Sequence, residues 1–263
     1  MRAVIVALAG AMLASAPAAA NDPAPKAPPP VYVPPAPPRA PAVPVRTEAG
    51  LALAQRLTVL VLPPDMMFEQ NLATIPVVLD AEAKKNPDLG TLLEQHPGLR
   101  TKLVETGQRE LTRILTAGLP AMQAAMAEHY ARNLDEATLR TTVEFYESEL
   151  GRKLIRVEYQ SIDPAVLTDK GLADGETFTR SDVDQLYVGV GGRMIKALTP
   201  QERVKVTAFT LSPAGQKLFR LTSRTKDLSV KLLNDLIGPH RAEIEAAYAE
   251  AVAEYFSSTA AAN

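Results

Sequence analysis

The chain has 263 residues, with 28 Lys and Arg against 30 Asp and Glu, which gives a formal net charge of −2 at pH 7. This near-neutral balance, without a run of basic residues, argues against nucleic acid as a partner. The chain has no Cys, which excludes a disulfide framework, a thiolate zinc site and a lipid-modified cysteine. The length allows one or two domains.

Residues 1–20 have the pattern of a secretory signal peptide. Arg2 precedes an apolar run over 3–13, and a small-residue cleavage site ends at Ala20. We therefore expect cleavage near Ala20, a periplasmic or secreted protein, and no integral membrane span afterwards. An uncleaved anchor is the alternative, but the apolar run is shorter than the ~20 residues that cross a bilayer, and Pro17 interrupts it.

Residues 21–46 form a proline-rich segment, since 11 of the 22 prolines of the chain lie between 22 and 45. Such a composition cannot bury a core, so the sequence predicts a disordered linker of polyproline type. It serves either as a solvated spacer or as a segment gripped by a partner.

From 47 to 256 the sequence predicts one all-helical domain, because apolar residues recur with the spacing of amphipathic helices. Asn86-Pro87-Asp88 and His96-Pro97-Gly98 predict turns between the helices. A kink or break is expected at Gly118-Leu119-Pro120. Small residues at 257–263 predict a disordered tail.

An internal repeat lies at the centre of this domain. Residues 134–158 align without a gap on 198–222, at a constant offset of 64. Seven positions are identical: Leu134 and Leu198, Phe145 and Phe209, Ser148 and Ser212, Gly151 and Gly215, Lys153 and Lys217, Leu154 and Leu218, and Arg156 and Arg220. In the second copy Pro213 follows the serine.

The shared residues predict a bent helix pair in each copy. Asp135 and Thr199 are expected to cap the first helix of each pair. Each repeat serine then ends that helix and starts the next at an angle, and the glycine that follows lets a neighbouring backbone come close. The repeat phenylalanine and leucine would lie on either side of the bend and face one core. The sequence thus predicts an all-α fold built around two such pairs.

A catalytic interpretation of the same residues is weaker. Ser148 and Lys153, with the acidic residues beside Ser148, resemble a Ser-Lys or carboxylate site. In the second copy the acidic pair becomes Leu211 and Pro213. Helix capping and packing explain the residues that the two copies share. A catalytic interpretation would require a site that was duplicated and then lost its acidic residues in the second copy.

Phe145-Tyr146-x-Ser148-x-x-Gly151-x-Lys153-Leu154, with Tyr130 before it and the helix start at Asp135–Leu139, resembles the signature of the domain of unknown function 2059 family. The resemblance covers about 125–225. It implies an all-helical, exported bacterial protein and transfers no catalytic residues. The family signature has Pro after the serine. The first copy has Glu149 there, whereas the second keeps Pro213.

The region between the copies predicts a polar loop over Thr168–Arg180, followed by a helix that Ser181 caps with Asp184 as partner. Asp169, Asp174 and Glu176 in the loop do not have the spacing of an EF-hand, so we expect solvent exposure rather than calcium binding. The cluster Gly189-Val190-Gly191-Gly192 lacks the ending of a phosphate loop, and we interpret it as a weak or tightly packed part of a helix.

No catalytic, cofactor or metal motif is present in the sequence. Of the three histidines, His96 is in a predicted turn, His129 adjoins Glu128, and His240 has Glu243 one turn away. Because a carboxylate-bridged metal site needs paired Glu-x-x-His motifs, we interpret these residues as surface charge. The expectation is a protein without cofactor, metal or catalytic residues.

The sequence predicts an exported, non-catalytic structural, assembly or stress-related interaction module that acts through a protein partner or self-association. The alternative is a binding module in which Met66, Met67, Met122 and Met126 enclose an apolar ligand such as a lipid acyl chain. A groove between the two repeat halves would favour that alternative. An enzyme with an unrecognised site is the second alternative and would need three or more polar groups that converge in one cleft.

Overall fold

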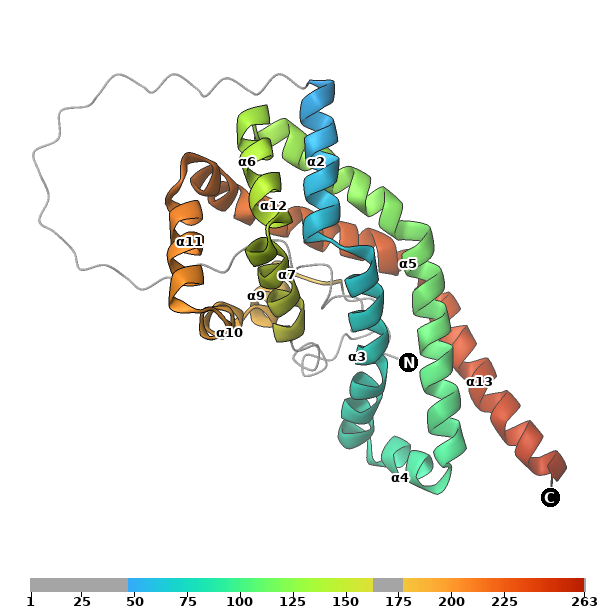
Figure 1. Cartoon of the computed structure of the whole chain (residues 1–263). Coiled ribbons are helices and arrows are strands. Elements are labelled where there is room, and N and C mark those ends of the chain that lie inside the picture. Colours follow the sequence, from blue (N-terminus) through green and yellow to red (C-terminus); the bar gives the residue numbers. More distant parts are fainter. Residues whose placement is uncertain (1–46, 163–176, 263) are drawn as a thin grey trace, which may run out of the picture.

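A computed structural model describes residues 47–162 and 177–262, and over these ranges the protein is all-α, as predicted (Figure 1). The predicted leader (1–20) and proline-rich linker (21–46) lie outside the described residues. The helices are α2 (Glu48–Val61), α3 (Pro64–Lys85), α4 (Pro87–Gln95), α5 (Pro97–Asn133), α6 (Glu136–Glu147), α7 (Glu149–Ser161), α9 (Arg180–Leu186), α10 (Val190–Ala197), α11 (Pro200–Leu211), α12 (Pro213–Ile237), the 3₁₀ turn η1 (Gly238–His240) and α13 (Arg241–Ala262).

Prolines begin many of these helices. Pro64, Pro87, Pro97, Pro200 and Pro213 each occupy the first helical position. Proline is tolerated there because the N–H it lacks would have no partner inside the helix. The two connections predicted as turns, 86–88 and 96–98, are therefore shorter than the three residues expected for each. In each, one residue separates two helices and the proline already belongs to the second.

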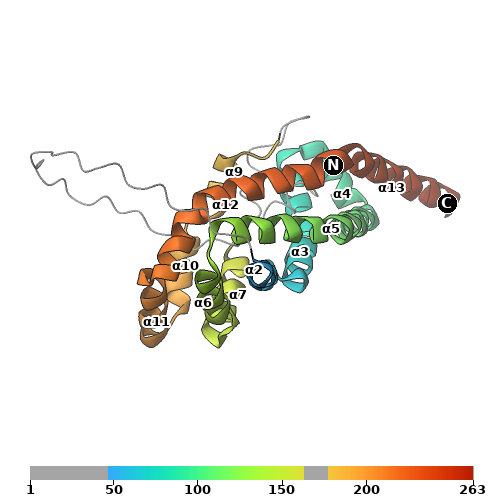
Figure 2. The same cartoon turned by 90° about the horizontal axis from the view of Figure 1, so that it is seen from above.

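Helix α5 is the spine of the fold. Helices α2, α3, α12 and α13 all pack against it, and α2 also packs on α6. Figure 2 shows α12 running beside α5. Leu111, Ile114 and Leu115 of α5 are fully buried in one continuous hydrophobic core. Burial of such side chains stabilises the fold by about 1.5–3 kcal/mol each.

Pro120 lies inside α5, where a kink or break was predicted. The helix continues through this residue to Asn133 and is not broken. Figure 1 shows α5 bent along its length rather than straight. Leu119 beside the proline is buried, so the bend wraps α5 around the core.

The helix after the gap in the described residues begins earlier than predicted. Thr179, not Ser181, is the N-cap. It accepts from Asp182 N, and the Asp182 carboxylate accepts from Thr179 N at 2.8 Å. Asp184 has another role, because it accepts a hydrogen bond from Lys226 at 2.7 Å. The capping box lies two residues upstream of the one we predicted.

The glycine cluster at 189–192 spans the start of a helix. Gly189 has a φ of 77°, a left-handed conformation that favours glycine, and it separates α9 from α10. Gly191 and Gly192 lie in the first turn of α10, and a Cβ on Gly192 would meet nothing within 4 Å. Of the two alternatives predicted, tight packing is therefore wrong at Gly192, and Gly189 supplies a turn instead of continuing a helix.

The C-terminal residues are also more regular than predicted. Helix α13 extends to Ala262, beyond the expected start of a disordered tail at 257. The side chains of Ser258 and Thr259 donate to Tyr255 O at 2.8 Å, which is compatible with a continuing helix. The rings of Tyr255 and Phe256 contact His96 edge-on, 5.9 and 5.1 Å between centroids.

Among the described residues, Glu48–Lys85, which spans α2 and α3, is long and apolar enough to cross a membrane by length and composition. Here Leu57, Met67 and Val78 from this stretch are fully buried in the protein core. A core helix passes the same test, so this property does not identify a membrane span. The absence of a span after leader cleavage stays a prediction.

Candidate functional site

The two segments that repeat in the sequence each bend at a serine. Ser148 separates α6 from α7, and Ser212 separates α11 from α12, both with extended backbone. Each serine Oγ accepts from the glycine N–H three residues later at 3.1 Å and donates to the phenylalanine carbonyl three residues earlier at 2.6 Å. One hydroxyl thus gives a hydrogen-bond partner to a carbonyl at the end of the first helix and to an N–H at the start of the second.

Gly151 and Gly215 lie where the second helix of each pair touches the end of the first. A Cβ on Gly151 would be 2.3 Å from Phe145 O, and one on Gly215 would be 2.1 Å from Phe209 O. A backbone carbonyl cannot move away without opening the bend. Both positions therefore need glycine for close approach, since neither has a positive φ.

The two bends face each other. The rings of Phe145 and Phe209 stack with centroids 3.8 Å apart and planes 5° from parallel. Tyr146 adds an edge-on contact to Phe209 at 6.3 Å. Phe145 and Phe209 are equivalent positions of the two copies, so the two pairs meet through the same residue of each.

Each repeat lysine binds the first helix of the other copy. Lys153 Nζ lies 2.9 and 2.8 Å from the carboxylate oxygens of Glu202, and Lys217 bonds Asp135 and lies 3.3 Å from Thr138 Oγ1. Thr138 and Glu202 are equivalent positions, so the two contacts are reciprocal. Lys153 and the Thr199 N–H hold the pKa of Glu202 at about 2. Lys217 and the Thr138 N–H do the same for Asp135.

A cavity of about 390 Å³ lies between the two helix pairs. Side chains from both copies and from α10 line it, and most of them are apolar. The apolar set is Phe145, Tyr146, Leu154, Met194, Ile195, Leu198, Val206, Phe209, Leu211, Leu218 and Phe219, and the rest are Glu158, Gly191, Arg203, Thr207, Thr210 and Gly215.

The α11 side of this cavity is poorly covered. No side chain of α11 is fully buried, and the helix lies at the edge of the molecule, packed mainly against α12 (Figure 1). Ile195, Leu211 and Phe219, which line the cavity, are 53%, 66% and 44% exposed. Large apolar side chains left exposed together mark a binding surface more often than a structural face.

Glu158 is a buried acid in the cavity wall. Its side chain is almost fully buried, and its Oε1 has no hydrogen-bond partner. Burial raises the pKa of the Glu158 carboxyl well above its ordinary value, because the buried environment disfavours the charged form. The buried Tyr187 hydroxyl also lacks a partner. Unpaired buried polar atoms are rare in native proteins, and they mark places where a ligand or water completes the structure.

Arg203 is the cation of the cavity lining. Its Nε donates to Leu198 O at 3.1 Å, which holds the side chain near the start of α11. Some other arginines of the described chain pair with carboxylates, such as Arg100 with Asp80, whereas Arg193 and Arg224 bond to carbonyl or amide oxygens. Arg203 has no such ion pair among the described residues. Its remaining N–H donors are available to a ligand.

The structure brings some of the predicted residues to the cavity. Phe145, Leu154, Phe209, Gly215 and Leu218 line it, whereas the other repeat residues form the bends and the ion pairs behind it. The methionines expected to enclose a ligand do not line this cavity. Met67, Met122 and Met126 are buried core residues, Met66 is partly buried against the core, and Met194 lines the cavity instead. That part of the prediction is wrong, because the face that carries these methionines packs inside the core.

Sequence reasoning missed Glu158 and Arg203. Glu158 follows Leu154 by four residues and precedes Tyr159, so it lies on the buried face of α7, and this spacing was a usable signal. Arg203 had no such signal. Its role depends on α10 and α11 lying over the other helix pair.

The histidines are placed in ordinary contacts. His129 Nε2 lies 3.1 Å from Thr225 Oγ1, and burial lowers the pKa of the His129 ring. Among the described residues, no three or more His, Asp or Glu side chains form a group that could hold a metal ion. The loop acids Asp169, Asp174 and Glu176, which are not expected to bind calcium, lie outside the described residues.

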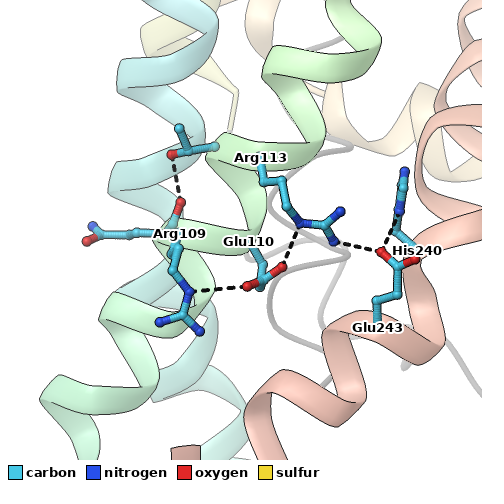
Figure 3. Close-up of polar contacts among 7 residues, drawn as sticks. Arg109, Glu110, Arg113, His240 and Glu243 are labelled. Carbon is cyan, nitrogen blue, oxygen red and sulfur yellow. Dashed lines mark hydrogen bonds and ion pairs between the residues drawn. The ribbon is translucent and has the colours of Figure 1, made fainter.

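His240 and Glu243 belong to an ion-pair network rather than a cleft (Figure 3). Arg113 bonds Glu110 at 2.9 Å and Glu243 at 2.8 Å, and His240 Nδ1 lies 2.9 Å from the same Glu243 oxygen. His240 and Arg113 together lower the pKa of Glu243. The network joins α5 to the start of α13, which is a structural role.

Substitution of either bend glycine by alanine should destabilise the fold. Gly151→Ala and Gly215→Ala each place a Cβ against a backbone carbonyl, and we expect a loss of about 1–3 kcal/mol or more in the free energy of unfolding. Gly192→Ala is the matched control in an exposed helix, where we expect a gain of up to ~1 kcal/mol. Urea unfolding measures all three, and equal stability of the three variants would contradict our account of the bends.

Glu158→Gln should change how stability depends on pH. The folded carboxyl keeps its proton where the unfolded chain has lost it, so its contribution is fully present below the ordinary pKa of 4.5 and declines as pH rises toward the raised value. Glutamine has no proton to lose. We expect the variant to gain about 1 kcal/mol or more over the wild type between pH 5 and pH 8, measured by urea unfolding.

The exposed substitution Glu144→Gln is the control for this pH series. The difference in the free energy of unfolding between this variant and the wild type should be the same at pH 5 and at pH 8. A constant difference for Glu158→Gln as well would show that Glu158 is not held neutral by burial.

Comparison with known proteins supports the resemblance inferred from the sequence. No curated protein and no solved structure matches the chain. Residues 120–167 match the model of a family described as "Uncharacterized protein conserved in bacteria (DUF2059)". The match covers the end of α5 and the first bent helix pair, α6 and α7, and does not reach the second copy, to which the sequence resemblance extended. Four of the residues that line the cavity, Phe145, Tyr146, Leu154 and Glu158, lie in this matched segment.

Proposed function

We propose that this protein is an exported, non-catalytic helical module that binds an apolar chain in the cavity between its two bent helix pairs. The observation that carries the proposal is the cavity of about 390 Å³ between the copies. Protein interiors are close-packed, with few voids larger than a water molecule. A space of this size has the volume range of small-molecule sites, about 300–1,000 Å³.

The lining favours binding over catalysis. Its ionisable side chains are Glu158, Arg203 and Tyr146, set among apolar residues. Burial raises the pKa of both Glu158 and Tyr146, which favours the neutral form of each side chain. A neutral acid and a neutral phenol in an apolar wall suit the recognition of a hydrocarbon better than the activation of a nucleophile.

Export is part of the proposal and rests on sequence. The leader pattern over 1–20 and the resemblance to an exported bacterial family support a periplasmic location. An aqueous compartment of this kind suits a protein that shields an apolar ligand from water.

A protein partner is the second candidate, and it has its own observation. Val204 and Leu211 are 69% and 66% exposed, and they lie on α11, a helix with no fully buried side chain. This is the interaction module that the sequence first suggested. A partner that covers α11 would bury these side chains without entering the cavity.

Val206→Trp should block binding of an apolar ligand. Val206 is half-buried in the cavity wall, so a larger side chain there would fill the space. We expect saturable binding of the neutral fluorescent probe N-phenyl-1-naphthylamine by the wild type and at least about tenfold weaker binding by the variant, given the 1–3 kcal/mol typical of overpacking.

Val204→Trp is the matched control. It changes the same residue type on the same helix, but Val204 is exposed and does not line the cavity. Probe binding should survive in this variant. Absence of saturable binding by the wild type, or equal loss in both variants, would overturn the proposal. Loss of self-association or of a partner in the Val204→Trp variant alone would favour the second candidate.

A further inference from the structure

We propose that the ligand is a single-chain fatty acid whose carboxylate binds Arg203 while its hydrocarbon chain lies in the cavity. This inference rests on the proposed function and identifies the ligand class of the same site. It follows from how charge, exposure and volume are distributed around the cavity.

The cationic group lies on the solvent-exposed side of the site. Arg203 is exposed and lines the cavity, and its Nε is bound to Leu198 O at 3.1 Å. The guanidinium has five N–H donors and stays charged at all physiological pH values. With no carboxylate paired to it among the described residues, it has free donors that match the two oxygens of a carboxylate.

Neighbouring acids do not oppose an anion at this place. Glu202, adjacent in sequence, is bound to Lys153 at 2.8 Å and also takes part in the capping box of α11. Burial raises the pKa of Glu158 in the cavity wall, which favours its uncharged form. Arg203 is the one cationic side chain of the lining, and its charge complements one carboxylate.

The rest of the lining suits a hydrocarbon chain. The aromatic stack of Phe145 on Phe209, with Leu154 and Leu218 behind it, presents apolar surface from both copies. A volume of about 390 Å³ is at the small end of the range for ligand sites, which favours one chain over a two-chain phospholipid. A cationic rim that leads into an apolar interior is the complement of an amphiphile with an anionic end.

The test compares two ligands that differ at the head group alone. Isothermal titration calorimetry of the intact mature protein with dodecanoate and with dodecanol, at neutral pH, low salt and below micelle formation, should show dodecanoate binding about tenfold to hundredfold tighter. That ratio corresponds to the strength of hydrogen bonds to charged groups. Arg203→Gln should remove the difference by weakening dodecanoate alone.

Lys205→Gln is the charge-matched control, since it removes one positive charge from the same exposed helix without touching the cavity lining. It should keep the preference for dodecanoate. Arg203→Lys should restore part of the preference, and circular-dichroism melts confirm that each variant is folded. If the glutamine variant unfolds, the lysine variant and the wild-type ratio still decide the question.

The outcomes separate the two proposals. Equal wild-type affinity for dodecanoate and dodecanol, or an unchanged preference in Arg203→Gln, would overturn the carboxylate assignment and leave the apolar site in place. Tighter binding of dodecylamine would overturn it as well. Failure of every amphiphile to bind would overturn both proposals.

Discussion

The close approach of two helix backbones at each bend is the constraint on which the site depends. At Gly151 and Gly215 the next helix begins so near the previous carbonyl that a Cβ would lie within 2.3 Å of it. The serine hydroxyl, shared between a donor and an acceptor, satisfies the backbone at that point. The repeat phenylalanine just before each bend contacts the phenylalanine of the other helix pair.

The two pairs then meet through equivalent residues. Phe145 stacks on Phe209, and the repeat lysine of each copy contacts the first helix of the other. The two copies differ in their surroundings, because α12 continues to Ile237 along α5 whereas α7 ends at Ser161, and α11 has no fully buried side chain.

The polar groups at the cavity lower the stability of the fold relative to an apolar lining. A buried carboxyl with an unpaired oxygen destabilises the fold, and an apolar residue at Glu158 would pack without that penalty. Arg203 on the exposed side contributes little to stability without a carboxylate partner. Both features are compatible with a site kept for a ligand that has a polar end and an apolar body.

The sequence by itself determined the local structure. The all-α fold, the caps at Asp135 and Thr199 and the bends at the repeat serines follow from spacing, capping residues and glycine, which act within a few residues of the chain. It did not identify Thr179 as a cap, because Ser181 two residues later is also a capping residue type. It also did not predict the turn at Gly189 between α9 and α10. Only the tertiary structure decided that Glu158 and Arg203, 45 residues apart, line one cavity and that the methionines do not. The reason is physical, because local rules fix which face of a helix is apolar, whereas the packing of helices distant in the chain fixes what that face meets.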